Sequence, residues 1–172
     1  ITSQLEQPFE KIKSKYNQNL CSLFESKINE NEFWNLVLGN DNIIDSKIIS
    51  KTFLKKSSIN YEFLNFAKSL KIQGHSIGIL SNLTPETFTC IDADLLEDFD
   101  YHFYSNSIKL SKPNPEIYQH VCDQIPSKNI LFIDDKQENL DAAKSFGIHT
   151  VLFNSKDFSD GLIEEKILDF VK

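Results

Sequence analysis

The sequence predicts an α/β fold, in which a small N-terminal helical cap precedes a three-layer α/β/α core with a parallel sheet. From residue 57 onward, helical patterns alternate with short, fully apolar strands. Such strands are typical of a parallel sheet that helices cover on both faces. Residues 1–56 instead show helical periodicity and contain no convincing strand. We therefore expect two domains, a cap over residues 1–56 and a core over residues 57–172.

The cap is expected to be helical because its apolar residues recur at spacings of three, four and one. The first stripe consists of Phe9, Ile12, Tyr16, Leu20, Leu23 and Phe24. A second helix is predicted from Asn29, a favoured N-cap residue, to Gly39, a favoured stop. A third, short helix is predicted over residues 46–54.

The core is expected to begin with an amphipathic helix and then to alternate strands with helices. The predicted order is a helix over 61–72, a strand within 76–82, a strand near 101–104, a helix over about 115–124, a strand over 130–134, a helix over 137–146, a strand over 148–153 and a last helix over about 160–171. Ligands of parallel sheets bind beyond the carboxyl ends of the strands. Those ends are therefore where we expect functional residues.

Composition excludes several classes of protein. The 172 residues carry a formal charge of −7 with no Arg, so nucleic acid is a poor partner. No apolar run reaches the length of a membrane span, and no signal peptide is visible. Cys21, Cys90 and Cys122 lack the spacing of a disulfide framework or a zinc site. We expect a reduced, cytoplasmic protein that binds a small molecule, as a monomer or a homodimer.

Polar side chains follow three of the predicted strands. Ser81-Asn82 ends one strand, Lys112 lies in the loop after the next, and Asp134-Asp135 ends a third. Two adjacent acids are costly unless a cation lies beside them, and Mg²⁺ prefers oxygen ligands. Lys112 and Ser81 suit the oxygens of a phosphate. The pattern predicts a Mg²⁺ and phosphate site at this edge of the sheet.

Structural explanations compete with this prediction. Asp134-Asp135 could cap the following helix, Lys112 could be a solvated loop residue, and Ser81 and Asn82 could be turn residues. Asn139 could make a local structural bond. A P-loop ATPase is excluded because the glycine-rich motif is absent. A phospho-receiver domain is disfavoured because its acid pair comes first in the chain, not last.

The stretches "GILSNLTPE", "SKPNPEIY" and "FIDDKQENLDAAKSFGIHTVLF" resemble the second, third and fourth motifs of the haloacid dehalogenase-like (HAD) hydrolase superfamily. The resemblance covers about residues 57–155. In addition, "ESKINENEFWNLV" resembles the helical cap of the branch with glucose-1-phosphate phosphatases and the epoxide hydrolase phosphatase domain. The resemblance implies a Rossmann-like core and a Mg²⁺-dependent phosphatase that hydrolyses a small phosphomonoester, such as a sugar phosphate, through an aspartyl-phosphate intermediate.

The resemblance also implies a role for each site residue. Asp135 would ligate the metal directly, and Asp134 would support it. Ser81, Asn82 and Lys112 would bind the phosphoryl group, and Ser81 and Lys112 would stabilise its developing charge. Residues 1–56 would close over the site.

The first motif of the superfamily, an apolar strand that ends in Asp-x-Asp, is missing from the sequence. The Asp92–Asp94 pair lies in the wrong order and follows no apolar strand, so we interpret it as a surface helix or loop. We expect the nucleophile strand upstream of Ile1. Two alternatives stay open, a metal-independent 2-haloacid dehalogenase and a catalytically inactive binding protein that keeps the fold.

Overall fold

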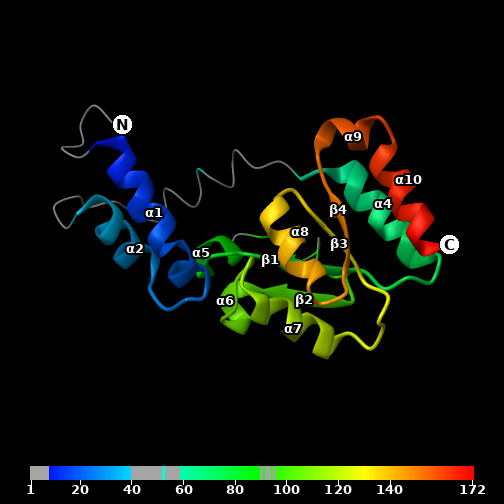
Figure 1. The fold of residues 1–172 in the computed structure, drawn as a ribbon, viewed down its shortest axis with the longest axis horizontal. Helices are drawn as coiled ribbons and strands as arrows, with labels where there is room; N and C mark the ends of the chain where they lie inside the picture. The colour runs from blue at the N-terminus through cyan, green and yellow to red at the C-terminus, as the bar shows by residue number, and fades with distance from the viewer. Residues whose placement is uncertain (1–7, 40–51, 53–58, 90, 92–93, 95) are drawn as a thin grey trace. The chain divides into compact units, whose positions relative to one another are not determined.

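The computed structural model of this chain describes most of its residues (Figure 1), namely 8–39, 52, 59–89, 91, 94 and 96–172. Two compact units divide the chain. The first comprises Ile1–Ile59 and Ser76–Ser111, and the second comprises Asn60–His75 and Lys112–Lys172. The sequence-based division into a cap and a core stays a prediction. The helix expected over residues 46–54 lies outside the described residues apart from Thr52.

The first unit begins with two packed helices. Helix α1 spans Phe9–Phe24 and helix α2 spans Glu30–Leu38. Asn29 caps α2, because its side chain accepts a hydrogen bond from Glu32 N while the Glu32 side chain accepts one from Asn29 N. The apolar faces of the helices meet in a cluster whose buried members are Leu23, Phe33 and Val37. The predicted helices and the predicted start and end of α2 are therefore confirmed, whereas Phe9 and Tyr16 of the predicted apolar stripe are exposed.

The first unit also contains a pair of parallel strands. Strand β1 spans Gly78–Ser81 and strand β2 spans Tyr101–Tyr104, with Ser81 opposite Tyr104. Between them lies the short helix α5, Pro85–Phe88, and directly after β2 comes α6, Ser105–Ile108. The strands were predicted, and the two short helices were not.

The second unit is a helix–strand alternation that matches the expected order. It contains α4 (Tyr61–Ile72), α7 (Pro115–Gln124), β3 (Leu131–Asp134), α8 (Gln137–Lys144), β4 (His149–Leu152), α9 (Ser155–Ser159) and α10 (Leu162–Val171). Strands β3 and β4 are parallel neighbours, with Asp134 opposite Leu152. The helix predicted over 160–171 is shorter than expected. Gly161, in the left-handed region at φ 75°, separates α10 from the unpredicted α9.

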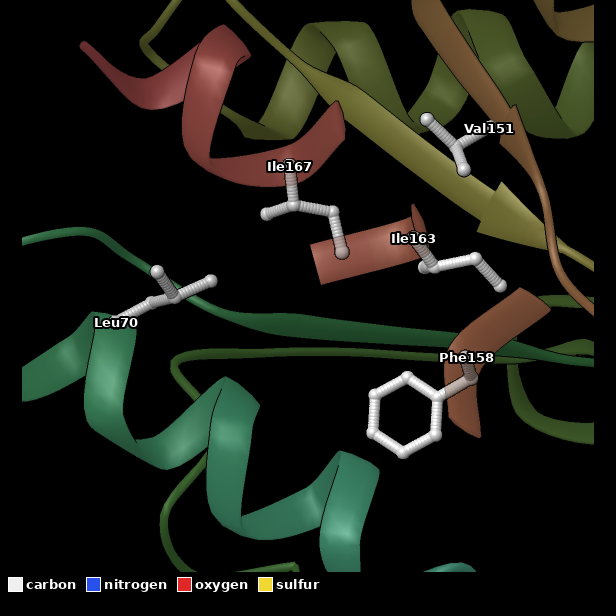
Figure 2. Packing of buried hydrophobic residues seen from close by; sticks show 5 residues of the cluster. All are labelled: Leu70, Val151, Phe158, Ile163 and Ile167. Atoms are coloured by element: carbon white, nitrogen blue, oxygen red, sulfur yellow. The ribbon is translucent and has the colours of Figure 1, made fainter. Parts of the chain in front are cut away.

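Helices cover both faces of β3. Its side chains alternate between the faces, and Leu131 and Ile133 pack against an apolar cluster. The buried members of this cluster are Leu70, Val151, Phe158, Ile163 and Ile167 (Figure 2). Phe132 faces the other way, and its ring centroid lies 5.9 Å from that of Tyr118 in α7. The layered arrangement leaves the carboxyl end of β3 as the place where polar groups gather.

Cys21 and Cys122 are free thiols, and Cys90 lies outside the described residues. Asp94 is exposed, whereas Asp92 is not among the described residues. Within the described part of the chain, no helix combines the length and the apolar character needed to cross a membrane.

Candidate functional site

The carboxyl end of β3 carries a buried carboxylate. Asp134 is the last residue of the strand and is 8% exposed. Strand alternation places it on the same face as Phe132, two residues earlier. An isolated carboxylate in such a position would be strongly destabilising. Its partners therefore decide whether the arrangement is stable.

Lys112 provides the opposite charge. Its Nζ donates a hydrogen bond to Asp134 Oδ2 at 2.7 Å, and both side chains are largely buried. The same ammonium group lies 5.4 Å from the centroid of the Phe132 ring, within range of a cation–π interaction. The loop after Lys112 is short, because α7 begins at Pro115 with Asn114 as its N-cap. The structure thus brings together two of the residues that the sequence singled out.

The second oxygen of Asp134 is also engaged. Asp134 Oδ1 accepts hydrogen bonds from Lys136 N at 2.8 Å and from Asn139 Nδ2 at 2.9 Å. Asn139 is 4% exposed. Its hydrogen bond to Asp134 is the local structural bond that the sequence allowed for, and it is made to a residue of the predicted site. Lys136 is the N-cap residue of α8 and makes no side-chain cap bond. The acid pair therefore does not cap α8 in the usual way.

These donors determine the protonation state of Asp134. Burial by itself would raise the pKa of the carboxyl group. The hydrogen bond and the charge of Lys112, together with the bonds from Asn139 and Lys136 N, outweigh burial and hold the pKa below its ordinary value. Asp134 is therefore an anion near neutral pH, with its charge matched by Lys112.

A buried tyrosine lies behind this ion pair. Tyr118 is 0% exposed, and its hydroxyl has no hydrogen-bond partner among the described residues. Burial raises the pKa of Tyr118, and the negative charges of Asp134 and Glu138 raise it further. The ring packs against Phe132 and Phe146. Tyr118 therefore acts as a neutral, apolar wall behind the site.

Asp135 differs from its neighbour because its side chain is exposed. Mg²⁺ in phosphate-handling sites is held by one or two carboxylates, with waters and phosphate oxygens completing the octahedron. Asp135 fits such a ligand, and Asp134 fits the supporting position because its oxygens already accept three hydrogen bonds. Among the described residues, no group of three or more His, Cys, Asp or Glu side chains is arranged to hold a metal ion. Asp134 and Asp135 thus offer carboxylates of the kind that Mg²⁺ uses, and a metal site at this strand end stays a prediction.

Ser81 and Asn82 belong to the first unit, where they end β1 and begin the loop after it. Both are partly buried. Ser105, fully buried at the start of α6, fixes this loop: its Oγ accepts from Leu83 N at 3.0 Å and donates to Leu83 O at 3.2 Å. The approach of Ser81 and Asn82 to Lys112 stays a prediction. Ser105 was not singled out from the sequence. Its position directly after the end of β2 is the signal that could have identified it.

Comparison with known proteins places these features in a family. The family model described as haloacid dehalogenase-like hydrolase matches residues 25–147. Bifunctional epoxide hydrolase 2 of Rattus norvegicus is 30% identical over 120 residues, which cover 65% of this chain and 22% of that protein. The phosphorylated carbohydrates phosphatase of Thermotoga maritima is 29% identical over 136 residues, covering 74% of this chain and 61% of that protein.

A third curated relative has a different chemistry. The (S)-2-haloacid dehalogenase 1 of a Pseudomonas species is 32% identical over 91 residues, which cover 50% of this chain and 40% of that protein. The chain spans less than a quarter of the length of the epoxide hydrolases.

Solved structures give the fold. A HAD family enzyme from Bacteroides thetaiotaomicron, in its magnesium complex, superposes with a TM-score of 0.71 at 23% identity. The match covers 88% of this chain and 83% of that one. Another structure of the same enzyme contains magnesium and inorganic phosphate. The likeness confirms the predicted α/β fold with a parallel sheet.

Proposed function

This chain belongs to the haloacid dehalogenase-like hydrolase family, and we propose that its protein is a Mg²⁺-dependent phosphatase acting on a small phosphorylated metabolite. The observation that carries the proposal is the pairing of Lys112 with Asp134 beside the exposed Asp135. A cation and an outward-facing acid at one strand end suit a phosphoryl group and its metal. The likeness to a phosphatase of phosphorylated carbohydrates and to a fold neighbour that contains magnesium and phosphate supports the proposal.

Each side chain has a defined task in this proposal. Lys112 neutralises charge on a phosphoryl oxygen, and the Ser81 hydroxyl and Asn82 amide donate hydrogen bonds to the others. Asp134 holds the Lys112 ammonium in place, so that Lys112 meets the substrate already oriented. Asp135 ligates the metal. When bound, Mg²⁺ supplies further positive charge to the phosphoryl oxygens.

The proposed reaction is completed by the Asp-x-Asp motif that the family resemblance implies. In the proposal, the first Asp of this motif attacks phosphorus and forms an aspartyl-phosphate, the bond from phosphorus to the substrate oxygen breaks, and the second Asp gives its proton to the leaving alcohol. The second Asp then takes a proton from water, which attacks the aspartyl-phosphate, releases inorganic phosphate and restores the first carboxylate. Lys112 stabilises the charge that develops in both steps.

The test uses the full-length protein with a generic aryl phosphate. Wild-type protein should release phosphate in the presence of Mg²⁺, and the release should stop when EDTA chelates the Mg²⁺. Asp135→Asn should abolish the release. The matched control is Asp141→Asn, which changes an exposed acid on α8 that is ion-paired with Lys144. Phosphate release by Asp135→Asn at the wild-type rate would show that the metal assignment is wrong.

A second candidate function is 2-haloacid dehalogenation, which the likeness to a haloacid dehalogenase favours. Halide release from 2-chloropropionate in the presence of EDTA would support it. Binding of phosphorylated metabolites without release of phosphate or halide would instead support an inactive binding protein. The second acid, Asp135, favours the phosphatase over the dehalogenase, because metal-independent dehalogenation has no use for a second clustered carboxylate.

A further inference from the structure

The turn after α1 contains a buried carboxylate that the proposed reaction does not use. Glu25, the C-cap residue of α1, is 6% exposed. Its Oε1 accepts a hydrogen bond from Ser111 Oγ at 2.8 Å, and Ser111 is fully buried. The other oxygen lies 2.6 Å from the ammonium group of the exposed Lys27. A buried serine and a buried carboxylate, 86 residues apart in the chain, thus pair directly.

Ser111 is the residue directly before Lys112. Neighbouring Cα atoms are held at a fixed spacing of about 3.8 Å by the peptide bond. The bond from Glu25 to Ser111 therefore constrains the backbone one residue before Lys112. Burial of both partners makes the bond to Glu25 a firm constraint, because a lost partner would leave a polar group unsatisfied away from water.

A second contact from the same turn supports this interpretation. Ser26 Oγ donates to Asn106 O at 3.3 Å, and Asn106 lies in α6, between β2 and Ser111. The turn Glu25–Ser26 thus contacts both ends of the segment that leads from β2 to Lys112. The first residue of α2, Glu30, is also buried, and it accepts a hydrogen bond from Thr84 Oγ1 at 2.7 Å in the loop that follows Ser81. Two buried carboxylates at α1 and α2 (the helical segment), those of Glu25 and Glu30, therefore accept hydrogen bonds from the segments that follow β2 and β1.

We propose that Glu25 and Ser111 are positioning residues that hold Lys112 in the orientation needed for phosphoryl transfer. The proposal rests on the proposed function, in which Lys112 contacts the phosphoryl group. Neither residue touches substrate, and both act through the backbone at position 112. The helical segment would then contribute to catalysis as a fixed support for the lysine loop, in addition to any role in substrate choice.

The variants separate the hydrogen bond from the charge. Ser111→Ala and Glu25→Leu remove the bond, whereas Glu25→Gln keeps an amide oxygen that can accept from Ser111. Lys27→Ala removes the counter-charge of the buried Glu25 and leaves the bond to Ser111, so it tests the charge apart from the bond. In full-length protein with an aryl phosphate, Ser111→Ala and Glu25→Leu should lower kcat about 10- to 100-fold, since small misplacements of catalytic groups have effects of this size. Glu25→Gln should keep a kcat close to that of wild type, and Lys27→Ala should lower stability while leaving kcat per folded molecule close to wild type.

Two results distinguish positioning from a merely structural role. Positioning predicts a loss in kcat with KM nearly unchanged, and the double variant Ser111→Ala/Glu25→Leu should be no worse than the more impaired single variant. A structural role would instead lower Tm and leave kcat per folded molecule unchanged. If Glu25→Leu does not fold, Ser111→Ala carries the test, because it removes only one buried oxygen.

A second readout does not depend on activity. Reductive methylation with formaldehyde and cyanoborohydride, followed by peptide mapping, should label Lys112 slowly because its side chain is only 11% exposed. Ser111→Ala and Glu25→Leu should speed the labelling of Lys112 relative to the exposed Lys136, and Lys27→Ala should not. A wild-type protein that releases no phosphate would refute the proposed function while the labelling still tests the link. Folded variants with wild-type kcat and wild-type labelling of Lys112 would refute the positioning role.

Discussion

Lys112 Nζ lies 2.7 Å from Asp134 Oδ2, and the exposed fractions of the two side chains are 11% and 5%. This distance describes a buried, hydrogen-bonded ion pair, unlike the exposed pairs of α8 and α10. Buried pairs and exposed pairs respond differently to the loss of one partner. Loss of either partner of the Lys112–Asp134 pair should therefore affect stability as well as activity.

Replacing the lysine should be costly for folding. Lys112→Met keeps the apolar stem but leaves the buried Asp134 carboxylate without its counter-charge, which should lower the free energy of unfolding by about 3–5 kcal/mol. Urea denaturation at pH 7 measures this change. The control Lys144→Met breaks an exposed pair, and its expected cost is at most about 1 kcal/mol. Equal costs for the two variants would contradict the burial of the Lys112–Asp134 pair.

The decrease in the free energy of unfolding at acid pH should depend in part on Asp134. Its pKa is lowered in the folded protein by Lys112, Asn139 and Lys136 N despite burial. A group with a lowered folded pKa stabilises the fold fully above its unfolded pKa, whose ordinary value is 3.8. That contribution decreases as the pH falls below this value and is gone below the folded pKa.

Comparison with Asp134→Asn isolates this contribution. The stability difference between wild type and Asp134→Asn should be constant from pH 7 to pH 5 and should shrink between pH 4 and pH 2, as urea titrations at each pH would show. Asp141→Asn is the exposed comparison: hydrogen bonds from Lys144 and Gln137 also lower the pKa of its carboxyl group, so its stability difference should shrink over the same pH range, but by less, because solvent screens the exposed pair. A difference that is independent of pH down to pH 2 would contradict the lowered pKa.

Tyr118 allows a prediction with the opposite sign. Its hydroxyl is buried without a hydrogen-bond partner among the described residues, so removing the oxygen also removes a desolvation penalty. Tyr118→Phe should leave stability unchanged or raise it by about 1 kcal/mol. Thermal unfolding measures the change, and Tyr101→Phe, on the partly buried ring of Tyr101 in β2, is the control. A loss of more than about 2 kcal/mol in Tyr118→Phe would reveal a hydrogen bond to the hydroxyl.

Sequence reasoning succeeded where the local pattern decides the structure. The bounds of α4, β2 and α7 agree with the predicted ranges, because amphipathic periodicity, a compact aromatic run and an Asn-Pro start are all local signals. The helices α5, α6 and α9 were missed because elements of four or five residues are too short to show a period. The helix predicted at the end of the chain began at about residue 160, because Gly161, which separates α9 from α10, was not interpreted as a break.

Only part of the site was open to the same reasoning. The strand-end rule identified Lys112 and Asp134, whose contact the structure shows, and the roles of Ser81, Asn82 and Asp135 stay predictions. The difference between Asp134 and Asp135 was given by the family resemblance, not by the pattern, because two adjacent acids look alike in a sequence. The Glu25–Ser111 bond could not be predicted, since the partners lie 86 residues apart and no periodicity links them.

The three protein donors around Asp134 have a consequence for how the protein survives without its proposed ion. The strand end keeps its charge balance through Lys112, Asn139 and Lys136 N alone. A cation held by the exposed Asp135 could therefore leave and return without exposing an uncompensated charge in the interior. We therefore expect the protein to stay folded when a chelator removes the proposed Mg²⁺, and to bind Mg²⁺ again when the ion is added back.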